Sequence, residues 1–315
     1  MLISIDRPAF RWLPSVDLPI DDHQTLRIET VQGRGDVCCC FHGSLTDSSP
    51  KVTTGEPKTT WEFLLEDEDT KVTPVFVKVA NVATLDNALL DNEVEKLTQL
   101  YPTDKKDEKF WRYLPKHYAH LDVDGRHAHV MTLADGYLSL ERVIREYPEG
   151  VDYRDAAWML KRCLAAVGFA HEQGIVHGAM LPPHLLVHPT GHGAKIVDWC
   201  YATAKGGILS FIPGRFREFY PSEVLDRKRV TATTDIFLLG MSFIQLLGGD
   251  LTTKELPDRV PEPIRQLLTE MTAPQPTMRP GSAWDLHEEF DHIMVALVGK
   301  AKYRPLPIPP EVYDP

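Results

Sequence analysis

The stretch over residues 174–200 constrains the fold of this 315-residue chain more than any other. An apolar pair, Ile175-Val176, leads into a polar, turn-rich loop, and Leu185-Leu186-Val187 leaves that loop as a short predicted strand. The turn residues over 189–193 and the apolar run that follows predict a hairpin. This hairpin would bring the loop and the carboxylate of Asp198 to the same edge of the structure.

The rest of the chain divides into a strand-rich part and a later helix-rich part. Alternating or β-branched patterns predict strands at 25–31, 37–41, 61–65, 72–80, 110–118 and 127–133, with an exposed polar loop over 43–60. The dipeptide Asp124-Gly125 predicts a turn between the last two of these strands. Helices are predicted at 86–100, 140–146 and 152–173, the last two with Ser139 and Asp152 as N-caps. This order predicts an α+β fold with a β-rich N-lobe and a helical C-lobe.

The same reading divides the chain into four parts. An N-terminal arm covers residues 1–24, the N-lobe 25–133, the C-lobe 134–300, and an extended, proline-rich tail 301–315. We treat these boundaries as expectations from the composition and from the order of the predicted elements.

Composition narrows the function classes. The net charge of −11 argues against nucleic-acid binding and against an anionic membrane surface. No apolar run reaches membrane-spanning length, and residues 1–19 lack a signal-peptide core. Five cysteines, three of them consecutive at 38–40, form a poor disulfide framework and favour the cytoplasm. They also lack the Cys-x-x-Cys spacing of zinc sites, so we interpret them as ordinary strand residues.

The opening stretch resembles two protein-kinase motifs, the catalytic loop and the metal-binding Asp-Phe-Gly. His177 and Pro182 match the kinase loop, and Asp198 stands where kinases have the magnesium-binding carboxylate. Three positions depart from the family: the catalytic base, the loop lysine and the metal-binding Asn are replaced by Ala179, Leu181 and His184. The resemblance therefore implies a phosphotransferase scaffold with a degenerate catalytic loop.

Two residues resemble the kinase pair that holds nucleotide phosphates. Lys78 lies in an alternating apolar run like the third kinase strand, and the helix that follows carries Glu93 as its preferred partner and Glu95 as a competing one. Without such a partner, a lysine in a strand is usually a solvent-exposed residue at the edge of a sheet.

Other N-lobe segments resemble nucleotide-contacting parts of kinases. Gly33 and Gly35 occupy the position of the glycine loop, although a simple hairpin turn explains them equally well. Met131 and Leu133 stand in a segment that resembles the hinge, where backbone groups bind adenine.

The C-lobe resemblance rests on three further residues. Glu223 ends a segment similar to Ala-Pro-Glu, Asp235 begins a helix similar to the central kinase helix, and Arg279 precedes a proline. The resemblance implies a buried Glu223–Arg279 ion pair and an Asp235 that anchors the catalytic-loop backbone. The chain is identified as protein-kinase-like, with a C-lobe that most resembles bacterial serine/threonine kinases. Aminoglycoside kinases, which share the His-Gly dipeptide, are a weaker resemblance.

The resemblance implies a catalytically impaired pseudokinase, with ATP and Mg²⁺ or Mn²⁺ as candidate ligands and a protein as partner. Kinase chemistry needs a carboxylate base, neutralising charge and oxygen ligands for the metal, and the degenerate loop lacks them. One alternative is an ATP-dependent phospho- or nucleotidyl-transferase with a rearranged site and His177 or His184 as base. Another is an interaction module with an occluded nucleotide pocket. Trp199 and Cys200 in place of Phe-Gly favour it, because a bulky Trp could enter the pocket and the lost glycine stiffens the turn.

Overall fold

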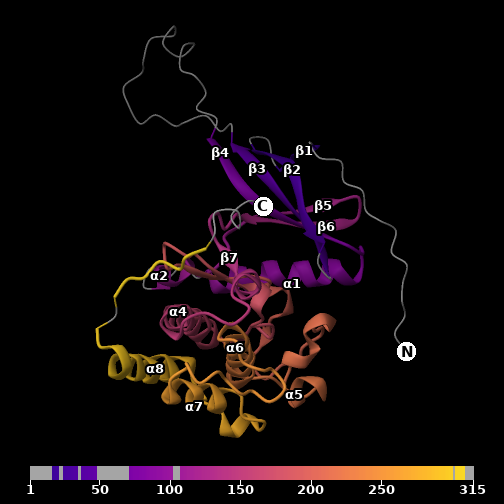
Figure 1. Cartoon of the computed structure of the whole chain (residues 1–315). Coiled ribbons are helices and arrows are strands. Elements are labelled where there is room, and N and C mark those ends of the chain that lie inside the picture. Colours follow the sequence, from indigo (N-terminus) through magenta and orange to yellow (C-terminus); the bar gives the residue numbers. More distant parts are fainter. Residues whose placement is uncertain are drawn as a thin grey trace. The chain divides into compact units, whose positions relative to one another are not determined.

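The computed structural model describes residues 16–20, 24–34, 37–47, 71–101, 107–300 and 302–308 (Figure 1). These residues form two compact units. The sheet unit contains the described residues up to Leu90 together with His117–Leu133, and the helical unit contains Asp91–Lys116 and the described residues from Ala134 onward. Helix α1 (Leu85–Leu100) begins in the sheet unit and ends in the helical unit.

The sheet unit is built on six antiparallel strands in the order β1-β2-β3-β4-β6-β5. In chain order these strands are β1 (Val16–Pro19), β2 (Gln24–Arg34), β3 (Cys38–Asp47), β4 (Lys71–Ala80), β5 (His117–Val123) and β6 (Arg126–Thr132). Valines 75, 77 and 79 alternate along β4 and are fully buried, as period-two burial of one sheet face requires. They pack with apolar residues of the neighbouring strands, including Ile28, Phe41 and Val130.

A tight turn joins β5 to β6. Asp124 and Gly125 have φ values of 52° and 75°, the left-handed pair that a two-residue hairpin turn needs. The Asp122 carboxylate accepts a hydrogen bond from the backbone N–H of Gly125 at 2.8 Å. The predicted turn at Asp124-Gly125 is therefore confirmed.

The helical unit contains most of the helices and two small sheets, ordered β10-β9-β7 and β11-β8. Helix α4 (Tyr153–Glu172) packs against α6 (Ala232–Leu246) and α8 (Ala283–Val298). The remaining elements are α2 (Glu108–Trp111), β7 (Leu138–Ser139), α3 (Leu140–Glu146), β8 (Ile175–Val176), β9 (Leu185–Val187), β10 (Ala194–Ile196), β11 (Thr203–Ala204), α5 (Ser222–Leu225) and α7 (Glu262–Met271), with short 3-10 turns between them.

The predicted helix caps are present. The Ser139 hydroxyl accepts from the backbone N–H of Arg142, and the Asp152 carboxylate accepts from that of Arg154. Gly174, with φ of 73°, follows α4 and turns the chain towards β8. None of the helices in the described part of the chain is long and apolar enough to cross a membrane.

Three element predictions need correction or fall outside the described residues. The strand expected at 110–118 is wrong: α2 and a turn occupy most of it, because Phe110 stacks on Phe169 of α4 with ring centroids 4.8 Å apart. The polar loop expected over 43–60 is wrong at residues 43–47, which belong to β3, and residues 48–60 lie outside the described part of the chain. The strand expected at 61–65 lies outside the described residues.

Candidate functional site

The degenerate loop over 177–184 lies in the helical unit between β8 and β9. The fully buried Asp235, in the first turn of α6, accepts hydrogen bonds from the backbone N–H groups of His177 and Gly178, each at 2.8 Å. Its carboxylate also lies 2.9 Å from Nε2 of His171. Helix α6 thus fixes the start of the loop, and the anchoring role expected of Asp235 is confirmed.

The ring of His177 is engaged on both nitrogens. Nε2 donates to the carbonyl of Val197 at 3.0 Å, and Nδ1 accepts from the backbone N–H of Ala179 at 3.2 Å. The side chain is fully buried, and burial lowers the pKa of His177 to about 4. The imidazole is therefore neutral at physiological pH and holds the loop together, with neither nitrogen available to a substrate.

The two apolar replacements in the loop are part of the core. Ala179 and Leu181 are both fully buried, and neither side chain has a polar group. The backbone carbonyl of Ala179 accepts from the N–H of Leu181 at 2.7 Å. No base, cation or metal ligand is provided at these two positions.

His184 joins the loop to Asp198, a contact that the sequence did not reveal. Its Nδ1 lies 2.8 Å from the Ala179 carbonyl, and its Nε2 lies 3.2 Å from a carboxylate oxygen of Asp198. Because a carbonyl can only accept, Nδ1 carries a proton, and Nε2 donates to Asp198 when the ring is an imidazolium. The expected metal carboxylate therefore has a histidine as its neighbour.

The segment after β10 is packed within the helical unit. Asp198 adopts the left-handed conformation, with φ of 63°. The next residue, Trp199, is fully buried; its indole N–H donates to the carbonyl of Ile196 at 2.9 Å, and its ring meets His177 edge-on at 4.6 Å. In this structure Trp199 is thus a core residue of the helical unit.

Helix α1 is tied to the segment that follows Asp198. The Asn92 amide donates to the carbonyls of Cys200 and Ala202 at 3.0 and 2.9 Å. Its neighbour Glu93 is fully buried. The part of α1 that carries Glu93 is therefore attached to the chain just beyond Asp198.

The expected nucleotide residues of the sheet unit lie on its central strands. Lys78, only 3% exposed, sits in β4 between Cys40 of β3 and His129 of β6. Met131 is buried in β6 opposite Phe76. Lys78 and Glu93 belong to different units, so their pairing stays a prediction.

The glycine and hinge positions are described in part. Gly33 lies in β2 opposite Cys40, directly after a shift in the β2–β3 register, and Leu133 follows the end of β6. Gly35 lies outside the described residues. A role of these positions in nucleotide binding stays a prediction.

Glu223 and Arg279 form the expected buried ion pair. Two guanidinium nitrogens of Arg279 donate to the two carboxylate oxygens of Glu223, at 2.6 and 3.1 Å. Arg279 also donates to the backbone carbonyls of Ala273 and Pro274, and its guanidinium lies over the Phe237 ring. Both partners are at least 94% buried, since Glu223 is 6% and Arg279 5% exposed. This pair is structural, as the resemblance implied.

Comparison with known proteins agrees with this architecture. No protein-family model matches the chain. Ribosomal protein S6 kinase alpha-3 of Mus musculus is 30% identical over 148 residues, which are 45% of this chain and 20% of that protein. Calcium/calmodulin-dependent protein kinase type 1 of Caenorhabditis elegans is 28% identical over 171 residues, 51% of this chain and 43% of that kinase. The matches thus span less than half of these curated relatives.

A solved structure establishes the fold. The crystal structure of a kinase domain aligns with a TM-score of 0.63 and 14% identity, covering 89% of this chain and 98% of that domain. Together with the antiparallel sheet and the helical unit, this likeness confirms the fold class expected from the sequence. The chain has a two-lobed, protein-kinase-like α+β fold and sequence similarity to protein kinases over about half of its length.

Proposed function

We propose that this chain is a catalytically impaired kinase-like protein that binds ATP and acts through a protein partner. The observation that carries the proposal is the state of the loop: Ala179 and Leu181 are buried and apolar, and both nitrogens of His177 are bound by the backbone. Loss of one well-placed catalytic group typically costs about 10²–10⁴ in rate. Such losses do not simply add, but three replacements in one loop leave little chemistry.

The groups expected to hold a nucleotide are retained. Lys78 and Glu93 are both buried, and charged side chains are seldom buried unless they are paired. Paired as proposed, Lys78 would bind the ATP phosphates. Asp198 offers the hard oxygen ligand that Mg²⁺ or Mn²⁺ prefers, whereas the imidazole of His184 is a poor ligand for Mg²⁺. These residues fit ATP with one metal ion better than the two-metal arrangement of an active kinase.

A second candidate is an ATP-dependent transferase with a rearranged site. The observation that favours it is the contact of His184 with Asp198, 3.2 Å from Nε2 to a carboxylate oxygen. Because Nδ1 donates to the Ala179 carbonyl, Nε2 would be the base once Asp198 turned from it to a metal ion. A third candidate is an interaction module with an occluded nucleotide pocket. The packing of Trp199 against His177 speaks against a Trp199 side chain that fills that pocket.

Thermal unfolding with ATP tests the proposal. ATP at about a hundred times its dissociation constant should stabilise the parent chain by roughly 2.7 kcal/mol. Lys78→Ala should reduce this shift, while Lys228→Ala, a change at an exposed lysine, should leave it intact. No shift with ATP, with or without Mg²⁺ or Mn²⁺, would contradict nucleotide binding and favour a pure interaction module.

Labelled ATP separates the two candidates. With γ-labelled ATP we expect no appreciable transfer to protein. Robust transfer that Asp198→Ala abolishes would refute catalytic impairment. Transfer of label from α-labelled ATP would instead support a nucleotidyl-transferase with a rearranged site.

A further inference from the structure

Residues 302–308, the tail segment, follow α8 and lie on the helical unit as an extended, proline-rich chain (Figure 1). Leu306 stands between two prolines of this segment and is buried. Its backbone N–H donates to the carbonyl of Pro189, in the turn between β9 and β10, at 3.1 Å. Leu306 is therefore the apolar anchor of the tail segment.

Arg304 is the charged anchor of the tail segment. Its guanidinium lies 3.1 Å from a carboxylate oxygen of Asp155 and 3.8 Å from one of Asp152, both at the start of α4. Asp155 is buried, and its other carboxylate oxygen accepts no hydrogen bond from any residue that the structure describes. Burial raises the pKa of Asp155, whereas the nearby charge of Arg304 lowers it. Because a buried carboxylate is costly without a partner, Arg304 compensates for the burial of Asp155.

An aromatic pair and two side-chain donors complete the contact. The ring of His192 stacks on that of Trp158, with centroids 4.3 Å apart. Nε2 of His192 donates to the carbonyl of Arg304 at 2.6 Å, and the Tyr147 hydroxyl donates to the carbonyl of Pro307. A proline has no backbone N–H, so a proline-rich segment is recognised mainly through its carbonyls and its side chains.

The residues that receive the tail segment form the tail site, which consists of Tyr147, Asp155, Trp158, Pro189 and His192. We propose that the tail site binds extended, proline-rich peptides with an arginine two residues before a leucine, and that a partner protein supplies such a peptide in place of the tail segment. Aromatic residues and side-chain donors commonly recognise segments of this kind, whose preformed extended shape loses little entropy on binding. Asp155 would select the arginine, and the buried position of Leu306 would select an apolar side chain.

The tail segment is held in a way that allows exchange. Leu306 is its only buried residue, whereas Tyr303 is 65% exposed and the Arg304 side chain 38% exposed. Ion pairs with a partly exposed member contribute little, so few contacts oppose displacement. The tether nevertheless makes the tail segment a competitor at high effective concentration. This proposal rests on the proposed function in that it requires a protein partner, but it does not depend on ATP.

Peptide binding to the full chain tests the proposal. Arg304→Ala combined with Leu306→Ala removes both anchors, so the tail site should be open in this double variant. A fluorescently labelled peptide with the sequence of residues 302–308 is titrated and its anisotropy is measured. We expect saturable binding to the double variant. Binding to the parent should be at least tenfold weaker, because its own tail segment competes.

Matched changes locate the bound peptide. Asp155→Asn, added to the double variant, should weaken binding at least tenfold, while Asp226→Asn, at an exposed carboxylate that pairs with Lys228, should not. The same peptide with Arg304→Ala should also bind at least tenfold more weakly. This second peptide needs no further protein variant, so it keeps the test valid even if Asp155→Asn unfolds.

Thermal melting shows whether each variant is folded. Absence of saturable binding by the folded double variant would overturn the proposal, and so would equal affinity for the two peptides. Unfolding of the double variant would overturn it as well, because the tail segment would then be a permanent part of the core. The thermal shift of the parent with ATP is measured separately, so a failure of peptide binding is distinguished from a failure of nucleotide binding.

Discussion

Two groups of residues in the helical unit differ in how far they keep the residue types of the kinase-like pattern. The anchoring residues Asp235, Glu223 and Arg279 keep the kinase-like identities and make short, buried hydrogen bonds. The loop positions Ala179 and Leu181 carry apolar side chains that are part of the core. The difference teaches that the shape of the loop depends on its anchors, and that this shape persists without the groups that kinase chemistry needs.

The largest effect should come from removing an anchor. Arg279→Ala leaves the buried Glu223 carboxylate without its partner and should lower the free energy of unfolding by about 3–5 kcal/mol. Arg265→Ala is the matched control, because Arg265 pairs with the exposed carboxylates of Asp258 and Glu262 and should cost about 0–1 kcal/mol. Urea unfolding of both variants measures the difference; similar midpoints would show that Glu223–Arg279 is no anchor.

The next effect concerns the pH dependence of stability through His177. Burial lowers its pKa in the folded protein to about 4, below the value of about 6.5 in an unfolded chain. Between these values the unfolded state binds more protons, so the stability contributed by neutral His177 is complete above about pH 6.5 and is lost as the pH falls towards 4. The loss should approach roughly 3 kcal/mol, from about 1.36 kcal/mol for each pKa unit.

Chemical unfolding at several pH values measures this loss. The variant His177→Gln has no imidazole at this position, so the stability difference between parent and variant should shrink as the pH is lowered from 7 to 4.5. A difference that is constant over this range would mean that His177 is accessible to protons in the folded state, and His177 would return as a candidate base.

Much of the fold could be predicted because local signals determined it. The alternation in β4, the Asp124-Gly125 turn and the caps Ser139 and Asp152 depend on neighbouring residues and were predicted correctly. The prediction of a strand at 110–118 was wrong because a short aromatic run fits a strand and a buried helical turn equally well. Only the packing of Phe110 on Phe169 decides between them, and these rings are distant in sequence.

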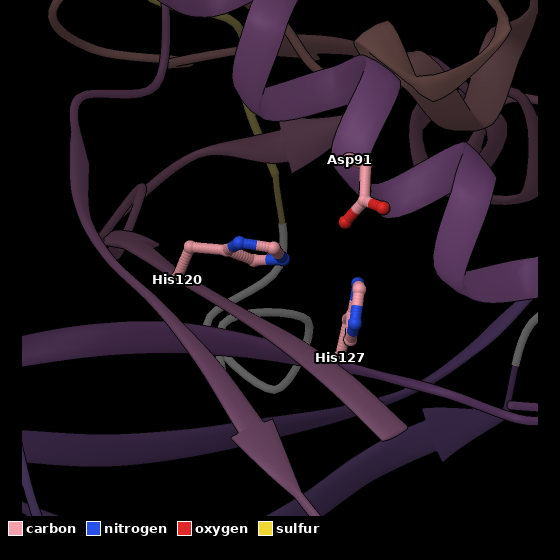
Figure 2. A group of neighbouring side chains, drawn as sticks. All are labelled: Asp91, His120 and His127. Carbon is pink, nitrogen blue, oxygen red and sulfur yellow. The ribbon is translucent and has the colours of Figure 1, made fainter. Parts of the chain in front are cut away.

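The sequence predicted the anchoring residues of the site correctly, but it did not reveal several of the contacts between side chains. Motif positions sufficed for Asp235 and for Glu223–Arg279. The His184–Asp198 contact and the attachment of Asn92 to Cys200, 108 residues away, depend on tertiary packing that no local pattern encodes. For the same reason the sequence showed four scattered histidines in the β5–β6 hairpin, and only the strand register brought His120 and His127 together (Figure 2).

The smallest effect should come from His184→Asn, which tests the chemical side of the comparison. The shorter side chain can keep only part of the contacts with the Ala179 carbonyl and Asp198, so stability should fall by about 0.5–1.5 kcal/mol. The substitution also frees the Asp198 carboxylate from its contact with the imidazole. The asparagine adds an amide oxygen, which is a better ligand for Mg²⁺ than an imidazole nitrogen. The thermal shift with ATP should therefore depend more on Mg²⁺ than in the parent, while His292→Asn, a change at an exposed histidine of α8, should behave like the parent.

Transfer of γ-labelled phosphate should stay absent in His184→Asn, because Ala179 and Leu181 still provide neither a base nor a charge. One added metal ligand should improve metal-assisted binding of ATP. It should not position the attacking hydroxyl, because that needs the carboxylate base that kinases have where this chain has Ala179. Appreciable transfer by this single variant would mean that the buried, apolar loop positions are no barrier to catalysis. Impairment would then reside in the His184–Asp198 contact alone, and the parent chain would be an enzyme held inactive by one histidine.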